Sequence, residues 1–427
     1  MADAVSDSTS YEINALVLIS SIGLTTDIKF MVQDLNIYED FFSNVMSGDL
    51  VIKDSQDVFG AFKMHGNEFL YIKLVTPSLQ AFEKYFRVYK VSDMALNNLN
   101  AYTYKIYFCS EEFVLNQQKL ISKSYKNMTN SDIVRDIVIN GLGVKPEKFL
   151  DKNIENTKNV QNLIVPYYRP FEAINWISSF SLNDNLSSAF FFYETHEGFN
   201  FKSLRTIYEQ APYKQITINP KNLNDEKDKE VSNRFIPDRY DIKQPFDMLE
   251  LIATGGVSGR MLAIDVLTQT RANRWFNPVR NNLVKMNEFV PFNEATNRFE
   301  DLLPDGVSFV RYFNAFQGNL VDKWLLQRAA QVSLLNSFRM NLQLSGDSQM
   351  TVGMMLDIDV PKLKPITTSE ESQQDGQKSG KFLVTQVRHR IVNNKYLNYI
   401  EVCKDSNKEA VPAFSKNNNI YEIAKKS

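Results

Sequence analysis

The amino-acid sequence predicts a mainly β protein with α+β insertions, in which two antiparallel, β-barrel-like domains are related by an internal repeat. Runs rich in β-branched and aromatic residues dominate both ends of the chain, which contains 30 Phe and 19 Tyr. Apolar residues at helical spacing are concentrated in the middle and before the last strands. Two strand regions far apart in the chain share one residue pattern.

The first β-domain is predicted over residues 10–120. Its strands are short, and turn residues such as Gly48, Gly66-Asn67 and Pro77 separate them. The five predicted strands cover 15–20, 50–54, 69–75, 85–91 and 102–109.

Residues 121–233 are predicted to form an inserted α+β module. Thr129-Asn130-Ser131 caps one amphipathic helix, which we expect to stop at Asn140-Gly141. A second helix begins at Pro170, because proline is favoured at the first helical position. The charged segment 222–233 is expected to be a solvated linker. Strand-like runs lie at 163–168, 189–193 and 199–204.

The second β-domain is predicted in two pieces, 234–270 and 337–405. Its strands are expected at 234–254, 261–270, 339–344, 355–360, 381–391 and 396–403. The segment 271–336 between the pieces is predicted as a second insertion, with a helix from Leu320 to Phe338 capped by Asn319. Residues 366–380 are expected to be a mobile loop, and 406–427 a loose tail.

The internal repeat is visible in the spacing of apolar residues in two segments. Phe86-x-Val88-x-x-Val91 matches Phe382-x-Val384-x-x-Val387, and the strands that follow end in Cys109 and Cys403. Upstream, Leu70-x-Ile72-x-Leu74 parallels Leu356-x-Ile358-x-Val360. Two equivalent domains in one chain allow three chains to present six equivalent units.

Composition narrows the classes of function. The 427 residues include 48 Lys and Arg against 50 Asp and Glu, a formal net charge of −2. Because gripping nucleic acid through phosphates needs a cationic surface, this balance argues against a nucleic-acid-binding protein. Two Cys exclude a disulfide scaffold. We expect neither a secretory signal nor a membrane span, since no run of about 18 apolar residues occurs.

Four segments, taken in order, resemble the central hub protein of the baseplate of contractile-tailed, T-even-like bacteriophages. They are SGDLVIKDS (47–55), MHGNEFLYIKLV (64–75), YYRPFEAINWISSF (167–180) and KFLVTQVRHRIVNNKYLNYIEVC (381–403). None of these is a catalytic motif. The resemblance rests on their order along the chain.

The resemblance implies a structural protein of the virion, with no enzymatic activity. Two tube-type domains per chain would form a homotrimeric ring of pseudo-six-fold symmetry, which joins a six-fold tail tube to a three-fold cell-puncturing spike and lines the DNA channel. Implied partners are further copies of the chain, a spike or tail lysozyme-like protein, tail tube or tube-initiator proteins, baseplate wedge or peripheral hub proteins, and DNA in transit. The implied location is the tail baseplate, after assembly in the host cytoplasm. The longer 271–336 region departs from the family pattern, which leaves its partners open.

The residue types that carry chemistry predict no catalytic, metal or cofactor site. His196 is expected in a turn or a solvated loop, and His389 on the surface face of a strand or between subunits. Cys109 and Cys403 are expected to be buried free thiols. The run from Gly255 to Arg260 lacks the ending of a phosphate loop and predicts a hairpin turn between strands. Adjacent Glu111 and Glu112 are interpreted as a polar turn.

One cluster is a candidate protein interface, because Arg, Trp and Phe are enriched at such interfaces. Stacking on single-stranded nucleic acid is the alternative reading of the same residue types. The cluster consists of Arg271, Arg274, Trp275, Phe276 and Arg280.

Two further functions remain open at this stage. A tail-borne carbohydrate-binding adhesin would present exposed aromatic platforms. A cell-wall hydrolase would need an acid/base pair, and the sequence offers none that stands out.

Overall fold

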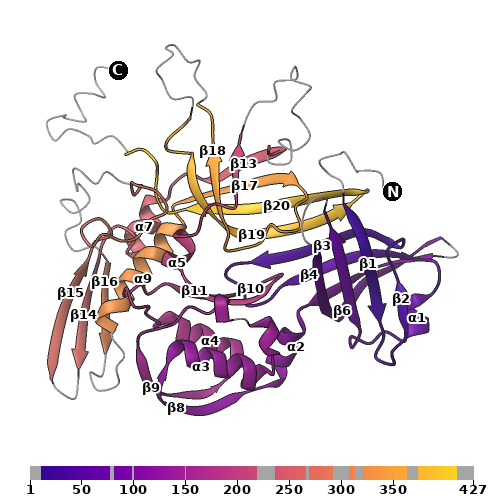
Figure 1. Ribbon diagram of the computed structural model, residues 1–427, viewed down its shortest axis with the longest axis horizontal. Coiled ribbons are helices and arrows are strands. Elements are labelled where there is room, and N and C mark those ends of the chain that lie inside the picture. The colour runs from indigo at the N-terminus through magenta and orange to yellow at the C-terminus, as the bar shows by residue number, and fades with distance from the viewer. Residues whose placement is uncertain are drawn as a thin grey trace.

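The computed structural model describes residues 11–76, 81–98, 101–149, 151–218, 236–265, 269–291, 307–312, 321–362 and 374–410. Within these ranges the strands form one sheet of 13 strands and three smaller sheets (Figure 1). All strand pairs are antiparallel except two, β12 with β18 and β14 with β16. The prediction of a mainly β, antiparallel fold is confirmed.

The N-terminal half of the large sheet is a five-strand unit with the spatial order β3-β4-β7-β6-β5. Its alternating apolar residues fill one core, to which Leu70, Phe86 and Phe108 contribute fully buried side chains. β1 (Glu12–Ile19) and β2 (Thr25–Asp27) extend the sheet beyond β5, and α1 (Val58–Phe62) packs against the core. The five strands are β3 (Val32–Asp40), β4 (Ser47–Asp54), β5 (Phe69–Val75), β6 (Phe82–Asn98) and β7 (Ala101–Cys109).

The C-terminal half repeats this order as β13-β17-β20-β19-β18. Here β12 (Lys214–Thr217), at the end of the inserted module, pairs with β18 in place of β1. A second core of apolar side chains lies on this half, including Leu356, Phe382 and Val402. The strands are β13 (Arg239–Gln244), β17 (Phe338–Ser345), β18 (Met355–Asp359), β19 (Gly380–Val392) and β20 (Lys395–Lys404).

The repeat extends to strand register. Leu70 lies opposite Phe86 in the first unit, and Leu356 lies opposite Phe382 in the second. The pairing of β6 with β7 shifts directly after Val88, and that of β19 with β20 shifts directly after the equivalent residue, Val384. A bulge at the same place in two strands is a conserved structural device and not a chance feature of apolar alternation. The internal repeat seen in the sequence is therefore present in the structure.

One strand joins the two units. The first part of β19 pairs with β18, while its second part, from Gln386 to Val392, pairs antiparallel with β3. The main-chain hydrogen bonds therefore run without interruption from one unit to the other. Figure 1 shows the yellow strands of the second unit beside the indigo strands of the first.

The inserted module lies against the large sheet at the junction of the units (Figure 1). Its core packs the helices on two hairpins, β8 with β9 and β10 with β11. The helix predicted after Thr129 is confirmed, and the Thr129 side chain caps it by accepting from the Asp132 backbone. It continues beyond Asn140-Gly141 as a π-helical segment that ends at Gly143, whose positive φ of 82° closes the last turn.

The elements of this module span residues 111–208. They are α2 (Glu111–Gln118), β8 (Ile121–Thr129), α3 (Asn130–Asp136), η1 (Ile137–Leu142), η2 (Pro146–Lys148), η3 (Asp151–Asn153), β9 (Val160–Tyr168), α4 (Pro170–Ser179), β10 (Phe190–Thr195), β11 (Gly198–Ser203) and α5 (Leu204–Tyr208).

Between β13 and β17 the structure differs from the predicted strands. Residues 248–254 form the helix α7 (Met248–Thr254), capped by the Asp247 side chain, so the expected strand over 234–254 is wrong there. Gly255 ends this helix with a φ of 92°, so the predicted hairpin between strands is a helix-to-strand turn. Asp247 and the glycine eight residues later are helix-cap signals, and they outweighed the β-branched residues between them.

A three-stranded sheet of order β15-β14-β16 follows, and α9 (Val321–Leu335) packs on it. The predicted helix is confirmed over Val321–Leu335, but it ends earlier than expected because Phe338 already begins β17. The strands are β14 (Gly259–Asp265), β15 (Thr270–Phe276) and β16 (Val307–Tyr312). The expectations for 222–233, 366–373, 411–427, Asn319 and Leu320 lie outside the described residues.

Lys404 is buried at the end of β20 without a carboxylate bonded to its ammonium. Its Nζ donates to the carbonyl oxygens of Gln377 and Ser379, and the rings of Phe338 and Phe382 lie 4.8 and 5.3 Å away. Burial lowers the pKa of Lys404 to about 7. The side chain thereby ties the turn before β19 to the end of β20.

We expect Lys404→Met to remove a pH-dependent part of the stability. Between about pH 7 and pH 10 the unfolded chain holds a proton on this lysine that the folded chain has lost, so stability rises with pH by up to about 1.4 kcal/mol per unit. Urea unfolding across this range should show the rise in the wild type and a smaller one in Lys404→Met. Lys395→Met, an exposed lysine on the same strand, should keep the wild-type slope. Equal slopes in all three proteins would contradict the assignment.

Candidate assembly site

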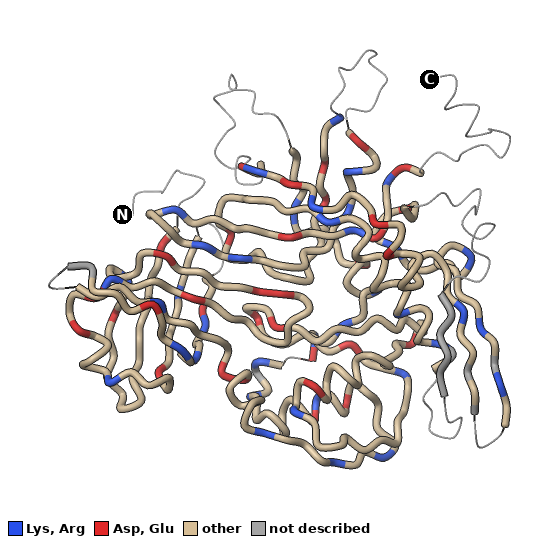
Figure 2. The backbone as a smooth tube through the Cα atoms, turned by 180° about the vertical axis from the view of Figure 1, so that it is seen from behind, with Lys and Arg blue, Asp and Glu red and all other residues tan. Residues whose placement is uncertain are grey.

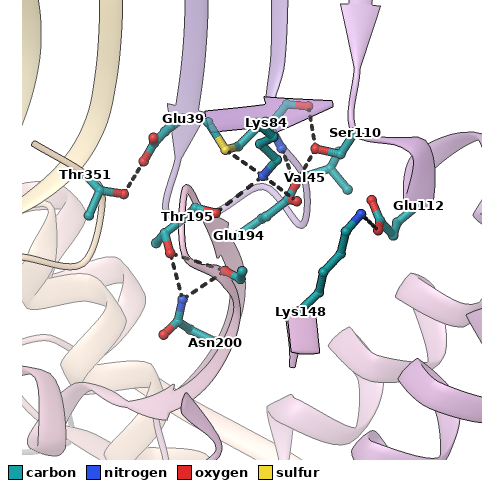
Figure 3. Close-up of polar contacts among 12 residues, drawn as sticks. Glu39, Val45, Lys84, Ser110, Glu112, Lys148, Glu194, Thr195, Asn200 and Thr351 are labelled. Carbon is teal, nitrogen blue, oxygen red and sulfur yellow. Dashed lines mark hydrogen bonds and ion pairs between the residues drawn. The ribbon is translucent and has the colours of Figure 1, made fainter. Parts of the chain in front are cut away.

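A buried ion pair connects the inserted module to the first unit. Glu194, the penultimate residue of β10, accepts hydrogen bonds from the Met46 backbone N–H at 2.8 Å, the Ser110 hydroxyl at 2.6 Å and Lys84 Nζ at 2.7 Å. Figure 3 shows Lys84 of β6 and Ser110, which directly follows β7, pointing at the Glu194 carboxylate, and Met46 directly precedes β4. Lys84 Nζ also donates a hydrogen bond to the Thr195 carbonyl oxygen, at 3.4 Å.

The environment makes this pair sensitive to loss of either partner. The side chains of Lys84 and Glu194 are 11% and 2% exposed. Desolvation of both charges offsets much of their attraction, but an unpaired charge left in the same place costs several kcal/mol. The pair therefore selects one docking position for the module.

Lys148 and Glu112 form a second contact of this kind at 2.7 Å, with Glu112 buried in the first turn of α2. The predicted polar turn at Glu111-Glu112 is thus a helix start.

A second polar cluster lies where the two units meet. Glu39 of β3 is fully buried and accepts from the Thr351 hydroxyl and from the Val352 backbone N–H at 3.2 Å. Its other oxygen is 3.6 Å from Nε2 of His389, whose Nδ1 lies 2.8 Å from the Tyr396 hydroxyl. Burial acts to raise the pKa of Glu39, but the contacts with His389 and Thr351 outweigh it and lower the pKa below its ordinary value.

His389 is 3% exposed, so its predicted position on a surface face or between subunits is wrong. Along β19 the side chains alternate: Val387 and Ile391 are buried, while Arg388 and Arg390 lie on the other face. His389 shares the parity of the buried residues and is retained inside by its contacts with Glu39 and Tyr396.

Cys109, Cys403 and His196 are further residues whose surroundings the sequence predicts. Cys109 and Cys403 are buried free thiols, as predicted, and burial raises the pKa of both, to about 12 for Cys109. Thiols of this kind are poor nucleophiles. His196 lies in the turn between β10 and β11, as predicted. Among the described residues there is no group of three or more His, Cys, Asp or Glu able to hold a metal, and no helix long and apolar enough to cross a membrane.

The predicted interface cluster is spread over both faces of one strand. Arg271, Arg274, Trp275 and Phe276 lie on β15, and Arg280 lies in the turn after it. The register with β14 places Trp275 opposite Arg260, whose guanidinium lies 5.0 Å from the indole ring. Trp275 is 48% exposed, whereas Phe276 packs towards α9. Figure 2 shows several Lys and Arg segments along this small sheet.

Sequence analysis did not predict two sheet edges that lack a partner strand. In the described residues β13 ends the large sheet, with β17 on its other side only. The second part of β6, after Val88, pairs with β7 but extends beyond β5. Exposed apolar side chains mark both edges, with Met94 and Leu96 on β6 and Tyr240 on β13. Unpaired edges of this kind are templates for pairing with another chain.

The arrangement of strands and helices described above is a known fold. Two solved structures share it, each with a TM-score of 0.55: a tail protein from Neisseria meningitidis MC58, 10% identical and covering 93% of this chain and 97% of that one, and the 43 kDa tail protein of prophage MuSo2 from Shewanella oneidensis, 9% identical and covering 93% and 99%. These likenesses concern the fold.

The sequence comparison is more specific. The chain is 22% identical over 420 residues to the probable baseplate hub protein gp334 of Vibrio phage KVP40, which covers 93% of this chain and 95% of that protein. No protein-family model matches. The expected resemblance to a phage baseplate hub protein is thereby confirmed, and the relatives carry the names of structural proteins.

We expect Glu194→Ala to destabilise the chain by about 3 kcal/mol, because Lys84 would be left buried without its carboxylate. Glu194→Gln should cost less, since an amide oxygen still accepts from Ser110. Urea unfolding gives the free energies. Glu197→Ala is the matched control, because Glu197 is 52% exposed and its pair with Lys152 is worth at most about 1 kcal/mol. Equal losses in Glu194→Ala and Glu197→Ala would contradict the role of Glu194.

Proposed function

We propose that the chain is a structural, non-enzymatic component of a contractile phage-tail baseplate. In this proposal three copies form a hub ring of pseudo-six-fold symmetry, which adapts a six-fold tail tube to a three-fold cell-puncturing spike and surrounds the path of DNA. Similarity to a baseplate hub protein over 93% of the chain supports the baseplate role. The repeated strand unit supports the ring.

The domain division follows from the repeat. We assign tube domain I to 10–120 and tube domain II to 234–270 with 337–405. The equal strand order of the two units supports this assignment. The regions 121–233 and 271–336 are then insertions and 406–427 a tail. Residues Arg271, Arg274, Trp275, Phe276 and Arg280 remain candidates for contact with a neighbouring baseplate protein.

The junction of β19 with β3 is the observation that most directly supports the proposed ring. β6 is the repeat equivalent of β19, and β13 is the equivalent of β3. The second part of β19 pairs with β3 inside the chain, whereas the matching edges of β6 and β13 have no partner strand among the described residues. If β6 of one copy pairs with β13 of the next, each junction between chains repeats the junction within a chain.

The internal register specifies that pairing. Arg388 of β19 lies opposite Tyr38 of β3. Ser92 lies four residues after Val88, as Arg388 lies four after Val384, so Ser92 is its equivalent.

The equivalent of Tyr38 is found in the same way. Ser47 of β4 and Arg339 of β17 lie opposite the two repeat cysteines. Tyr38 lies opposite Ser47, and Gln244 lies opposite Arg339. Ser92 of one copy should therefore face Gln244 of the next.

In the proposed ring the remaining partners meet the faces of the torus. A tail tube or tube-initiator protein would cover one face, a spike or tail lysozyme-like protein the other, and wedge or peripheral hub proteins the insertions. The virion baseplate is the proposed location, after assembly in the host cytoplasm.

We expect oxidation of Ser92→Cys/Gln244→Cys to link copies into covalent dimers and trimers on a non-reducing gel. Residues opposite each other in antiparallel strands have Cα atoms about 5 Å apart, within disulfide range. The buried Cys109 and Cys403 should not interfere. Mass photometry, on the chain alone and with the spike protein of the same phage, should show a trimer.

The control is Ser92→Cys/Lys395→Cys, which pairs the same strand with an exposed residue at the start of β20. Equal cross-linking of control and test protein would contradict the predicted register. A purely monomeric protein, with and without the spike, would contradict the ring.

A further inference from the structure

A groove separates the inserted module from α9. It has a volume of about 620 Å³ and is formed by the β8–β9 hairpin, α4 and the first turn of α9. Grooves of this size between modules are common sites for small ligands. The lining side chains that matter most are Lys126, Asn162, Trp176, Phe180 and Trp324.

One wall of the groove is aromatic. Trp176 of α4 and Phe180, which directly follows the helix, have ring centroids 5.3 Å apart at 74°. The Trp324 ring lies 6.5 Å from that of Phe180. Trp176 is 36% exposed, although Tyr168 also supports its ring at 5.9 Å. Phe180 is itself buried and supports Trp176, so the apolar surface that water reaches is formed by Trp176 and the half-buried Trp324.

The other wall is mixed, since exposed Ile164 and half-buried Leu163 lie beside its polar side chains. Ser124, Lys126, Gln161 and Asn162 line it from β8 and β9. The hairpin bulges here, with Asn127 at a φ of 53°, and the Asn127 backbone N–H donates to Asn162 Oδ1 at 3.0 Å. This bond sets the amide orientation, and bulges commonly aim side chains next to binding sites.

We propose that this groove binds a short neutral oligosaccharide. A pyranose ring has an apolar C–H face that stacks on indole and phenyl rings, and a rim of hydroxyl groups that pair with amides, hydroxyls and ammonium groups. The two walls of the groove offer these two kinds of surface to one ligand. The site goes beyond the proposed hub role, because it gives the chain a contact with glycans that needs no ring.

The test is titration of the full chain with chitotriose, maltotriose and cellotriose, followed by tryptophan fluorescence. The chain has three Trp, and two of them line the groove. We expect at least one sugar to quench the fluorescence at millimolar concentration. Trp176→Ala and Asn162→Ala should each weaken that binding about tenfold, and Trp176→Phe less.

Trp275→Ala is the matched control, because Trp275 is an exposed tryptophan on β15 outside the groove. It should leave the affinity unchanged, and circular dichroism should show all variants folded. No quenching by any of the three sugars overturns the proposal. So does an equal loss in Trp275→Ala, or binding of an apolar peptide with none of the sugars. Mass photometry of the same samples reports the ring separately, so failure of one proposal is distinguishable from failure of the other.

Discussion

Pairing of strand edges is the constraint on which the architecture depends. A strand with one open edge leaves its N–H and C=O groups without protein partners. Inside the chain, β19 solves this by turning from β18 to β3, so that two units become one sheet. By the same rule, the open edges of β6 and β13 among the described residues are places where a strand of another chain can pair.

Buried polar groups determine where the parts meet. The two units share Glu39, Thr351 and His389 at their junction, and the inserted module docks through Glu194 and Lys84. Each cluster supplies hydrogen-bond donors to a carboxylate that lies in a core. Apolar surfaces of similar area would tolerate sliding, whereas these pairs accept one geometry. Their role is to hold a rigid scaffold.

The two copies of the repeat have diverged by compensating changes. In the first, Gly48 faces Phe108, and a Cβ at Gly48 would lie 2.3 Å from the phenyl ring. In the second, the equivalent pair is Met340 with Val402. The first copy thus sets a large ring against a residue without a side chain, whereas the second packs two aliphatic side chains of intermediate size at the same place. The outer neighbours also differ, since β1 completes one unit and β12 the other.

Strands and helices that have local signals could be predicted from the residue pattern alone. Alternation at Leu70, Ile72 and Leu74, the cap at Thr129 and the proline at Pro170 identify their elements without reference to the rest of the chain. The repeat was equally visible, because two copies of one spacing can be compared directly. The burial of His389 and the ion pair of Glu194 with Lys84 are visible only in the folded chain. Both features depend on strands brought together from distant parts of the sequence. A side chain's surroundings are set by register across the sheet, and register is a property of two strands at once.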